Sequence, residues 1–151
     1  MTLDERLKAL GLELPPTPKP VGAYVPAVRT GNLIFTAGQL PIHGGLLVAT
    51  GKVPSETPLE KAQAAARQAC LNALAAVKSA CPLEQVKRIV RLNVFVNSAP
   101  GFTDQAKVAN GASELLVALF GEAGRHTRCA VGAAELPLNA PVELDLVVEV
   151  G

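Results

Sequence analysis

The 151-residue chain contains no tryptophan, and its other aromatic residues make up only 3% of the sequence. Proteins that stack bases on aromatic side chains need more of them, so this composition argues against a nucleic-acid platform and against a large aromatic pocket. An excess of charge is also missing, because 14 Lys and Arg face 13 Asp and Glu, for a formal net charge of +1. We therefore expect neither a nucleic acid nor a membrane surface as a partner.

Membrane spans, export signals and metal-ligand spacings are missing as well. No apolar run approaches the roughly 18 residues of a membrane span, and the first residues lack the basic-then-apolar order of a signal peptide. His43 and His126 lie in different predicted loops, and no H-x-x-x-H or C-x-x-C pattern occurs, so no metal site is predicted. The three cysteines cannot all pair within one chain, which favours a reduced, cytoplasmic protein. They are Cys70, Cys81 and Cys129.

The composition that remains is that of a globular protein, with 49% hydrophobic and 18% charged residues. Leucines at helical spacing predict a short amphipathic helix over 4–14. Four prolines between Pro15 and Pro20 then forbid helix and predict a stiff, extended linker. We therefore divide the chain into a helix and linker at 1–20 and a single domain at 21–151.

Hydrophobic periodicity predicts six strands and two long helices in the domain, which makes it an α+β protein. Thr30-Gly31-Asn32 is a short turn that predicts a hairpin of the first two strands. Thr57 is the expected N-cap of the first helix and Pro58 its first residue. One side of that helix is almost entirely alanine, so we expect it to pack flat against the sheet. The predicted strands are 21–29, 33–39, 46–50, 86–96, 127–135 and 142–150, and the helices are 58–80 and 103–121.

Alternation within the strands assigns side chains to two faces of this six-stranded mixed sheet. Val90, Leu92, Val94 and Val96 are expected to face the helices, whereas Arg91 and Asn93 face the other way. Glu143 and Asp145 of the last strand join them there. Charged and apolar residues mixed on that second face indicate a half-buried surface, and association of subunits is the natural way to cover it. Cys70 and Cys81 are predicted to be small packing residues.

Two segments carry more specific patterns: YVPAVRTGNLIFTAGQLP at 24–41 and RHTRCAVGAAELPLNAPVELDLVVE at 125–149. Together they resemble the RidA family, also called YjgF or L-PSP proteins, over about residues 20–150. The resemblance implies a chorismate-mutase-like α+β fold assembled as a homotrimer with intersubunit clefts. It also implies hydrolysis of reactive 2-imino acids, or their enamine tautomers, to 2-keto acids and ammonia. No metal or organic cofactor is implied.

The resemblance assigns the two principal roles to Arg128 and Glu143. A planar guanidinium can hold a carboxylate in a two-point grip, which suits Arg128 to bind the substrate; the alternative is a solvated arginine at a strand end. Glu143 would position or activate the water that attacks the imine carbon. Its alternative is a cross-strand ion pair with Arg91, and both could hold. Asp145 is expected to be structural.

Four further residues match positions that line the family's cleft. Tyr24 would close the pocket and donate a hydrogen bond, or else be an ordinary strand tyrosine. Gly38 would let the backbone approach a ligand closely, and the N–H groups near Gly38 and Ala130 would orient it. Asn110 would line the cleft from a helix, or else be a solvated helix residue.

The chain departs from the family pattern at three places. Ala37 stands where serine is common, Ala130 stands where Cys or Thr is common, and the approach at 124–127 is longer by about one residue. The leading hypothesis is a 2-iminobutanoate/2-iminopropanoate deaminase. The second is a non-enzymatic binder of a small carboxylate ligand. The third is an endoribonuclease or translation inhibitor. The net charge, the few aromatics and the lack of a paired-histidine site argue against it.

Overall fold

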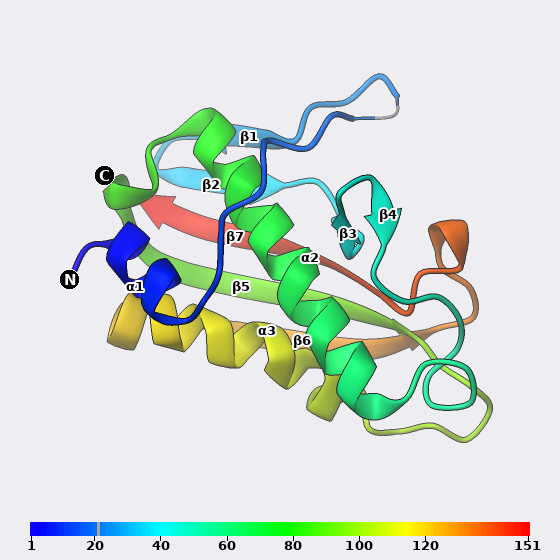
Figure 1. The fold of residues 1–151 in the computed structure, drawn as a ribbon. Coiled ribbons are helices and arrows are strands. Elements are labelled where there is room, and N and C mark those ends of the chain that lie inside the picture. The colour runs from blue at the N-terminus through cyan, green and yellow to red at the C-terminus, as the bar shows by residue number, and fades with distance from the viewer. Residues whose placement is uncertain (21) are drawn as a thin grey trace.

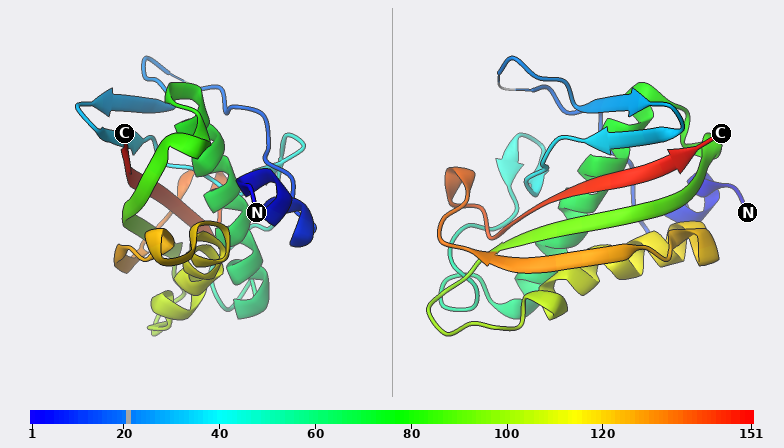
Figure 2. Two further views of the ribbon diagram at one scale, coloured as in Figure 1. Left: turned by 90° about the vertical axis from the view of Figure 1, so that its left-hand side faces the viewer. Right: turned by 180° about the vertical axis from the view of Figure 1, so that it is seen from behind.

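The computed structural model describes residues 1–20 and 22–151, which form a two-layer α+β structure. Five strands make one mixed sheet in the order β1-β2-β7-β5-β6, in which only β5 and β6 are parallel. Two long helices, α2 and α3, lie side by side over one face, and the other face has no helix on it (Figures 1 and 2). The bounds are β1 Ala27–Thr30, β2 Leu33–Thr36, β5 Val86–Asn97, β6 Thr127–Ala133, β7 Val142–Val150, α2 Leu59–Ala80 and α3 Gln105–Phe120.

The prediction of six strands in one sheet was wrong, because the third predicted strand belongs to a separate hairpin. Only Leu46–Leu47 (β4) of the predicted 46–50 is a strand, and it pairs with Ile42–His43 (β3). The Asn72 side chain of α2 donates hydrogen bonds of 2.9 Å to the Leu40 and Ile42 carbonyls. These bonds hold the segment against the helix and away from the main sheet.

The predicted N-terminal helix ends earlier than expected, at Ala9 (α1, Leu3–Ala9). Thr2 and Glu5 cap its start reciprocally, and Gly11, at a positive φ of 69°, follows its end. Leu7 is buried in the core, so α1 packs on the domain. The chain then crosses the outer side of α2 and reaches the sheet edge near β1 (Figure 1).

The first hairpin is confirmed, with Thr30 opposite Leu33 across a two-residue turn. Its strands are shorter than predicted, and the predicted start of the first strand at Val21 lies outside the described residues. The alanine face of α2 is confirmed, because every alanine on it is fully buried. Thr57, however, is not the N-cap. Its hydroxyl donates to the Thr50 and Gly51 carbonyls instead, and Pro58 takes the cap position.

The side chains of β5 that were predicted to face the helices do so, except near the start of the strand. Register shifts against β7 occur between Val86 and Arg88 and between Ile89 and Arg91. An irregularity of this kind moves a neighbouring side chain to the other face, so Ile89 is fully buried in place of the predicted Val90. In β7 the strict alternation is confirmed over the whole strand. Leu115, Leu116 and Leu119 of α3 are buried as predicted.

The open face of the sheet carries a mixture of apolar and polar side chains. Arg91 Nε donates to Asn93 Oδ1 at 2.9 Å, and Asn93 Nδ2 donates to Asp145 Oδ1 at 2.8 Å. Large apolar side chains stay exposed around this polar chain, among them Phe35 and Phe95. Of the helices in residues 1–20 and 22–151, none combines the length and apolar character needed to cross a bilayer.

Candidate functional site

Arg128 lies on β6, at the edge of the sheet, and faces the helix layer. Its register partner is Leu92, whose side chain is fully buried beneath the helices. The guanidinium nitrogen Nη1 donates to Asn110 Oδ1 at 2.8 Å and to Ser113 Oγ at 3.1 Å, both on α3. Arg128 is therefore anchored by a helix and is not a freely solvated strand-end arginine.

Ser113 extends this anchor to His126, and neither contact was predicted from the sequence. His126 Nδ1 lies 2.7 Å from the Gly124 carbonyl, which can only accept, so Nδ1 carries the proton. Nε2 lies 2.9 Å from the Ser113 hydroxyl, and in the neutral ring it accepts from that hydroxyl. Asn110 and Ser113 are three residues apart on one helix and so share a face. That spacing was the sequence signal for Ser113.

Ala130 lies two residues beyond Arg128 on the same side of β6, opposite Val94. Its side chain is half-buried against the core. We call this group, with its helix anchors, the arginine half-site. It consists of Asn110, Ser113, Arg128 and Ala130.

Glu143 lies on β7 and faces the open side of the sheet. Its register partner is Phe95, which is exposed on that side. The carboxylate packs against Gly38, where an added Cβ would lie only 2.5 Å from Glu143 Oε2. A side chain at position 38 would therefore displace the carboxylate. Tyr24, Gly38 and Glu143 line the same hollow, and we call them the glutamate half-site.

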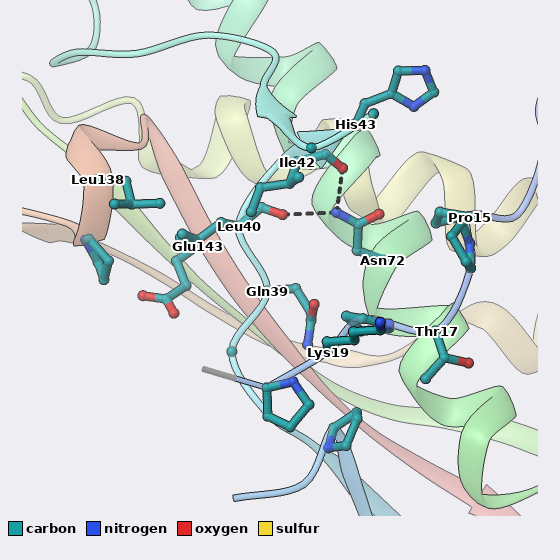
Figure 3. Close-up of a pocket in the computed structure, with 18 of the residues that line it drawn as sticks. Pro15, Thr17, Lys19, Gln39, Leu40, Ile42, His43, Asn72, Leu138 and Glu143 are labelled. Atoms are coloured by element: carbon teal, nitrogen blue, oxygen red, sulfur yellow. Dashed lines mark hydrogen bonds between the residues drawn. The ribbon is translucent and has the colours of Figure 1, made fainter. Parts of the chain in front are cut away.

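The glutamate half-site opens into a pocket of about 730 Å³ (Figure 3). Figure 3 shows Glu143 and Leu138 on one side of this pocket and Pro15 and Thr17 on the other, with Gln39 between them. The proline-rich segment 13–20 thus forms a wall of the pocket that contains the candidate catalytic carboxylate. Tyr24 lies at the junction of this pocket with the hollow on the open face.

Electrostatics distinguish Glu143 from the other carboxylates. Burial raises its pKa, and the nearby negative charge of Asp145 raises that pKa further. Arg91 is engaged with Asn93. Within residues 1–20 and 22–151, neither Arg91 nor any other cation forms an ion pair with Glu143. The alternative of a cross-strand ion pair with Arg91 is therefore not what this chain forms.

The six predicted site residues thus fall into two groups that one chain does not bring together. Arg128 faces the helix layer from the edge strand, whereas Glu143 faces the open side from the middle of the sheet. In the described part of the chain, no group of three or more His, Cys, Asp and Glu residues could hold a metal ion. Cys70 and Cys81 are buried, as predicted for packing residues, and Cys129 is exposed.

Comparison with known proteins identifies close relatives over nearly the whole chain. A family model described as "YjgF/chorismate mutase-like, putative endoribonuclease" matches residues 4–150. Protein TCP17 of Trypanosoma cruzi is 46% identical over 147 residues, covering 95% of this chain and 91% of that protein. The 2-iminobutanoate/2-iminopropanoate deaminase of Escherichia coli K12 is 33% identical over 132 residues, covering 86% and 89%. A crystal structure described as a "putative endoribonuclease" from Shewanella oneidensis superposes with a TM-score of 0.95 at 37% identity, covering 99% of this chain and all of that one.

Proposed function

The chain belongs to the YjgF/chorismate-mutase-like (RidA) family, and from this premise we propose that it hydrolyses reactive 2-imino acids to 2-keto acids and ammonia. Enamines enter the same reaction through their imine tautomers. Two relatives, from Escherichia coli and Dermatophagoides farinae, carry the name 2-iminobutanoate/2-iminopropanoate deaminase. TCP17, which is more similar in sequence, carries a name without an activity. The proposal therefore depends on the site itself.

The separation of the two half-sites is the observation that carries the proposal. Each half-site holds one of the two groups that imine hydrolysis needs, and the two face different sides of one sheet. Association of copies would bring the arginine half-site of one copy against the glutamate half-site of its neighbour. The exposed apolar side chains of the open face would be covered in the same step. We propose a homotrimer with one such cleft between each pair of neighbours.

Arg128 would bind the carboxylate of the substrate. Asn110 and Ser113 hold the nitrogen Nη1, which leaves the N–H groups of Nη2 and Nε to grip a carboxylate at two points. Lysine could not reproduce this planar fork. Because the guanidinium is already oriented, little conformational freedom is lost when the ligand binds. Backbone N–H groups near Gly38 and Ala130 would complete the orientation of the substrate.

Glu143 would act on water. As the water oxygen bonds to the imine carbon, the carboxylate takes one proton from the water and passes it to the imine nitrogen, so the carbinolamine carries one hydroxyl and one amino group. The hydroxyl proton is then passed through Glu143 to the amino group, the carbon–nitrogen bond breaks, ammonia leaves and the carbonyl of the 2-keto acid forms. A carboxylate whose pKa is raised is a stronger base than an ordinary one, which suits it to take these protons. One water is consumed and one ammonia released, without an oxidant or a cofactor.

A second candidate function is the binding of a small carboxylate without turnover. It is favoured by Ala37, which lines the same hollow as Glu143 but offers no hydroxyl where serine is common in the family. We also propose a cytoplasmic location, because all three cysteines are unpaired.

Subunit complementation tests the cleft and the chemistry together. Arg128→Ala and Glu143→Gln are each purified and assayed for ammonia and keto-acid release from freshly generated 2-iminopropanoate. The two inactive variants are then unfolded together in equal amounts and refolded. In randomly mixed trimers about one quarter of the clefts regain both groups, so about one quarter of wild-type activity should return.

The outcomes separate the alternatives. Recovery in the mixture, but not in either variant refolded alone, supports a deaminase whose cleft is shared between copies. No recovery, with wild type refolded in parallel and fully active, would overturn the shared cleft. A wild type that binds pyruvate but accelerates no imine would favour the binding protein. Light scattering should give three times the 15.6 kDa chain mass.

A further inference from the structure

We propose that the pocket between Glu143 and the proline-rich segment 13–20 binds the substrate's side chain and selects 2-imino acids with branched or extended apolar side chains. This inference rests on the proposed function and concerns its substrate class. It assigns a role to the N-terminal segment, which lies outside the sequence motifs that carried the resemblance.

The segment is held in place by packing that precedes and accompanies it. Leu7 of α1 is buried in the core, and Leu12 and Leu14 pack against the same core from the start of the segment. The prolines that follow have fixed φ angles, so the segment loses little backbone freedom by lying in one path. The segment can therefore form a wall of the pocket before the ligand binds, with little further loss of conformational entropy on binding.

The opposite wall is held by the connection between β2 and β3. Asn72 fixes this connection through its two bonds to the Leu40 and Ile42 carbonyls, and Gln68 donates to the Asn72 amide oxygen at 3.1 Å. Asn72 lines the pocket, but its amide is already bonded to the protein. It shapes the pocket and is not placed to recognise a polar group on a ligand.

The size and lining of the pocket point to an apolar occupant. Its volume of about 730 Å³ far exceeds what the methyl group of 2-iminopropanoate would fill. Most of the residues that line it are apolar, although Glu13, Lys19 and His43 also contribute. Each methylene buried against such a surface improves binding about fourfold. The chief apolar wall residues are Leu14, Pro15, Leu40, Ile42 and Leu138.

Gln39 indicates where the polar end of the ligand would lie. Its side chain is 8% exposed, and its Nε2 donates to the Ala37 carbonyl at 3.3 Å. Within residues 1–20 and 22–151, no protein donor reaches the Oε1 atom of this amide, and Gln39 lies between Glu143 and the segment (Figure 3). No buried side-chain nitrogen or oxygen of the described residues lacks a partner, so this oxygen is open to the pocket. An N–H of the imine or enamine can therefore bond to it in place of water. The carbon chain beyond that group would then extend toward Pro15.

The primary test compares two imines under the same conditions. 2-Iminopropanoate and 2-imino-4-methylpentanoate are generated in place from alanine and leucine, and kcat/KM is measured for each. We expect the ratio of leucine-derived to alanine-derived kcat/KM to be about tenfold or more in the wild type.

Two wall variants with matched controls connect this ratio to the pocket. Ile42→Ala removes apolar surface from one wall, and Leu46→Ala makes a comparable change on the same hairpin outside the pocket. Thr17→Trp fills the opposite wall, and Lys8→Trp places the same ring on exposed α1. Both wall variants should lower the ratio several-fold, and both controls should leave it at the wild-type value.

Keto-acid binding separates failure of this inference from failure of the proposed function. Calorimetry should show 4-methyl-2-oxopentanoate binding more tightly than pyruvate, with Ile42→Ala narrowing the difference. If no imine is hydrolysed, the proposed function fails and this difference still decides the role of the pocket. A wild type that prefers the alanine-derived imine, or that binds both keto acids equally, overturns the inference. So does a control that lowers the ratio as much as its wall variant.

Discussion

The two half-sites differ in how the fold holds their principal side chain. Arg128 is tied to α3 by two hydrogen bonds, and one of these partners is itself tied to His126. Among the residues that the structure describes, no donor forms a hydrogen bond with the Glu143 carboxylate, which instead rests against the backbone of Gly38. Hydrogen bonds fix the position of Arg128, whereas packing against Gly38 limits the position of Glu143.

This difference fits the two tasks. A group that only binds a carboxylate gains from being oriented before the ligand arrives, because less freedom is lost on binding. A group that exchanges protons must change its charge during the reaction, and strong partners to one charge state would oppose that change. Burial and the neighbouring Asp145 instead raise the pKa of Glu143, so this carboxylate takes up a proton more readily than an ordinary one. The comparison therefore predicts that substitutions in the glutamate half-site lower kcat, whereas substitutions in the arginine half-site raise KM.

The largest effect is expected for Glu143→Gln. Loss of the proton-transferring group should lower kcat by about 10²–10⁴-fold while leaving KM and keto-acid binding nearly unchanged. Steady-state kinetics on 2-iminopropanoate measure both quantities. Glu149→Gln, on the same face of β7, is the control and should keep wild-type kcat. A rise in KM with unchanged kcat would place Glu143 in binding and remove the contrast.

Thermal unfolding of the same variant tests the raised pKa. A carboxyl whose pKa is higher in the folded state favours folding when protonated and opposes it when ionised. That relative stabilisation is present at low pH and is lost as the pH rises through the folded-state pKa. The Tm of Glu143→Gln relative to wild type should therefore increase as the pH rises from the unfolded-state pKa of about 4.3 through the folded-state pKa, and then level off.

Gly38→Ala should give the next largest effect by moving the carboxylate. The added methyl would lie 2.5 Å from Glu143 Oε2, and the flexible end of a side chain can yield without disturbing the backbone. Displacement of a catalytic group by about 1 Å can cost on the order of 10²-fold in rate, so we expect a ten- to hundredfold loss of kcat with little change in Tm.

A shortened carboxylate provides the control for that prediction. Glu143→Asp withdraws the carboxylate from Gly38, so the losses in the double variant should be less than additive. Full additivity would show that the methyl acts on something other than Glu143.

Features that depend on local periodicity were predictable from the sequence. The alternation of β7, the alanine face of α2 and the turn at Gly31-Asn32 are all set by residues close together in the chain. Errors arose where a contact outside the predicted element outweighed the preference of the residue within it. Thr57 has the right chemistry for a helix cap, but carbonyls of the preceding loop took its hydroxyl. The register shift near Ile89 depends on pairing with a strand more than fifty residues away.

The candidate site shows the same division. The motifs singled out Arg128 and Glu143 as candidates, because each residue type suits the chemistry proposed for it. Alternation in β7 already placed Glu143 on the open face. The opposite face of Arg128 depends on how β6 pairs with β5, which no local pattern contains. Ser113 and His126 were missed for a related reason. Their contact joins a helix to the approach of β6, where the chain departs from the family pattern.

Ser113→Ala should have a smaller effect than either change at Glu143 or Gly38. Arg128 would lose one of its two helix anchors but keep the bond to Asn110. A single hydrogen bond of this kind is worth about 0.5–1.5 kcal/mol, so KM and the Kd for pyruvate should rise about two- to tenfold with kcat nearly constant. Ser79→Ala, on α2, removes a hydroxyl that bonds only its own helix and is the control. A fall in kcat instead would mean that the arginine half-site takes part in the chemical step.

Asp145→Asn should give the smallest change, visible mainly in the pH profile. The replacement amide keeps an oxygen that can accept from Asn93 Nδ2, so the local geometry should persist. Removing the negative charge lowers the pKa of Glu143, since that charge is the second cause of its elevation after burial. The carboxylate then stays ionised to lower pH, and the acid limb of the kcat/KM profile should move to lower pH. High salt should screen the same interaction and move the wild-type limb in the same direction. A limb that stays in place in both experiments would mean that the profile reports another group, and that the proton-transferring role of Glu143 must be reassigned.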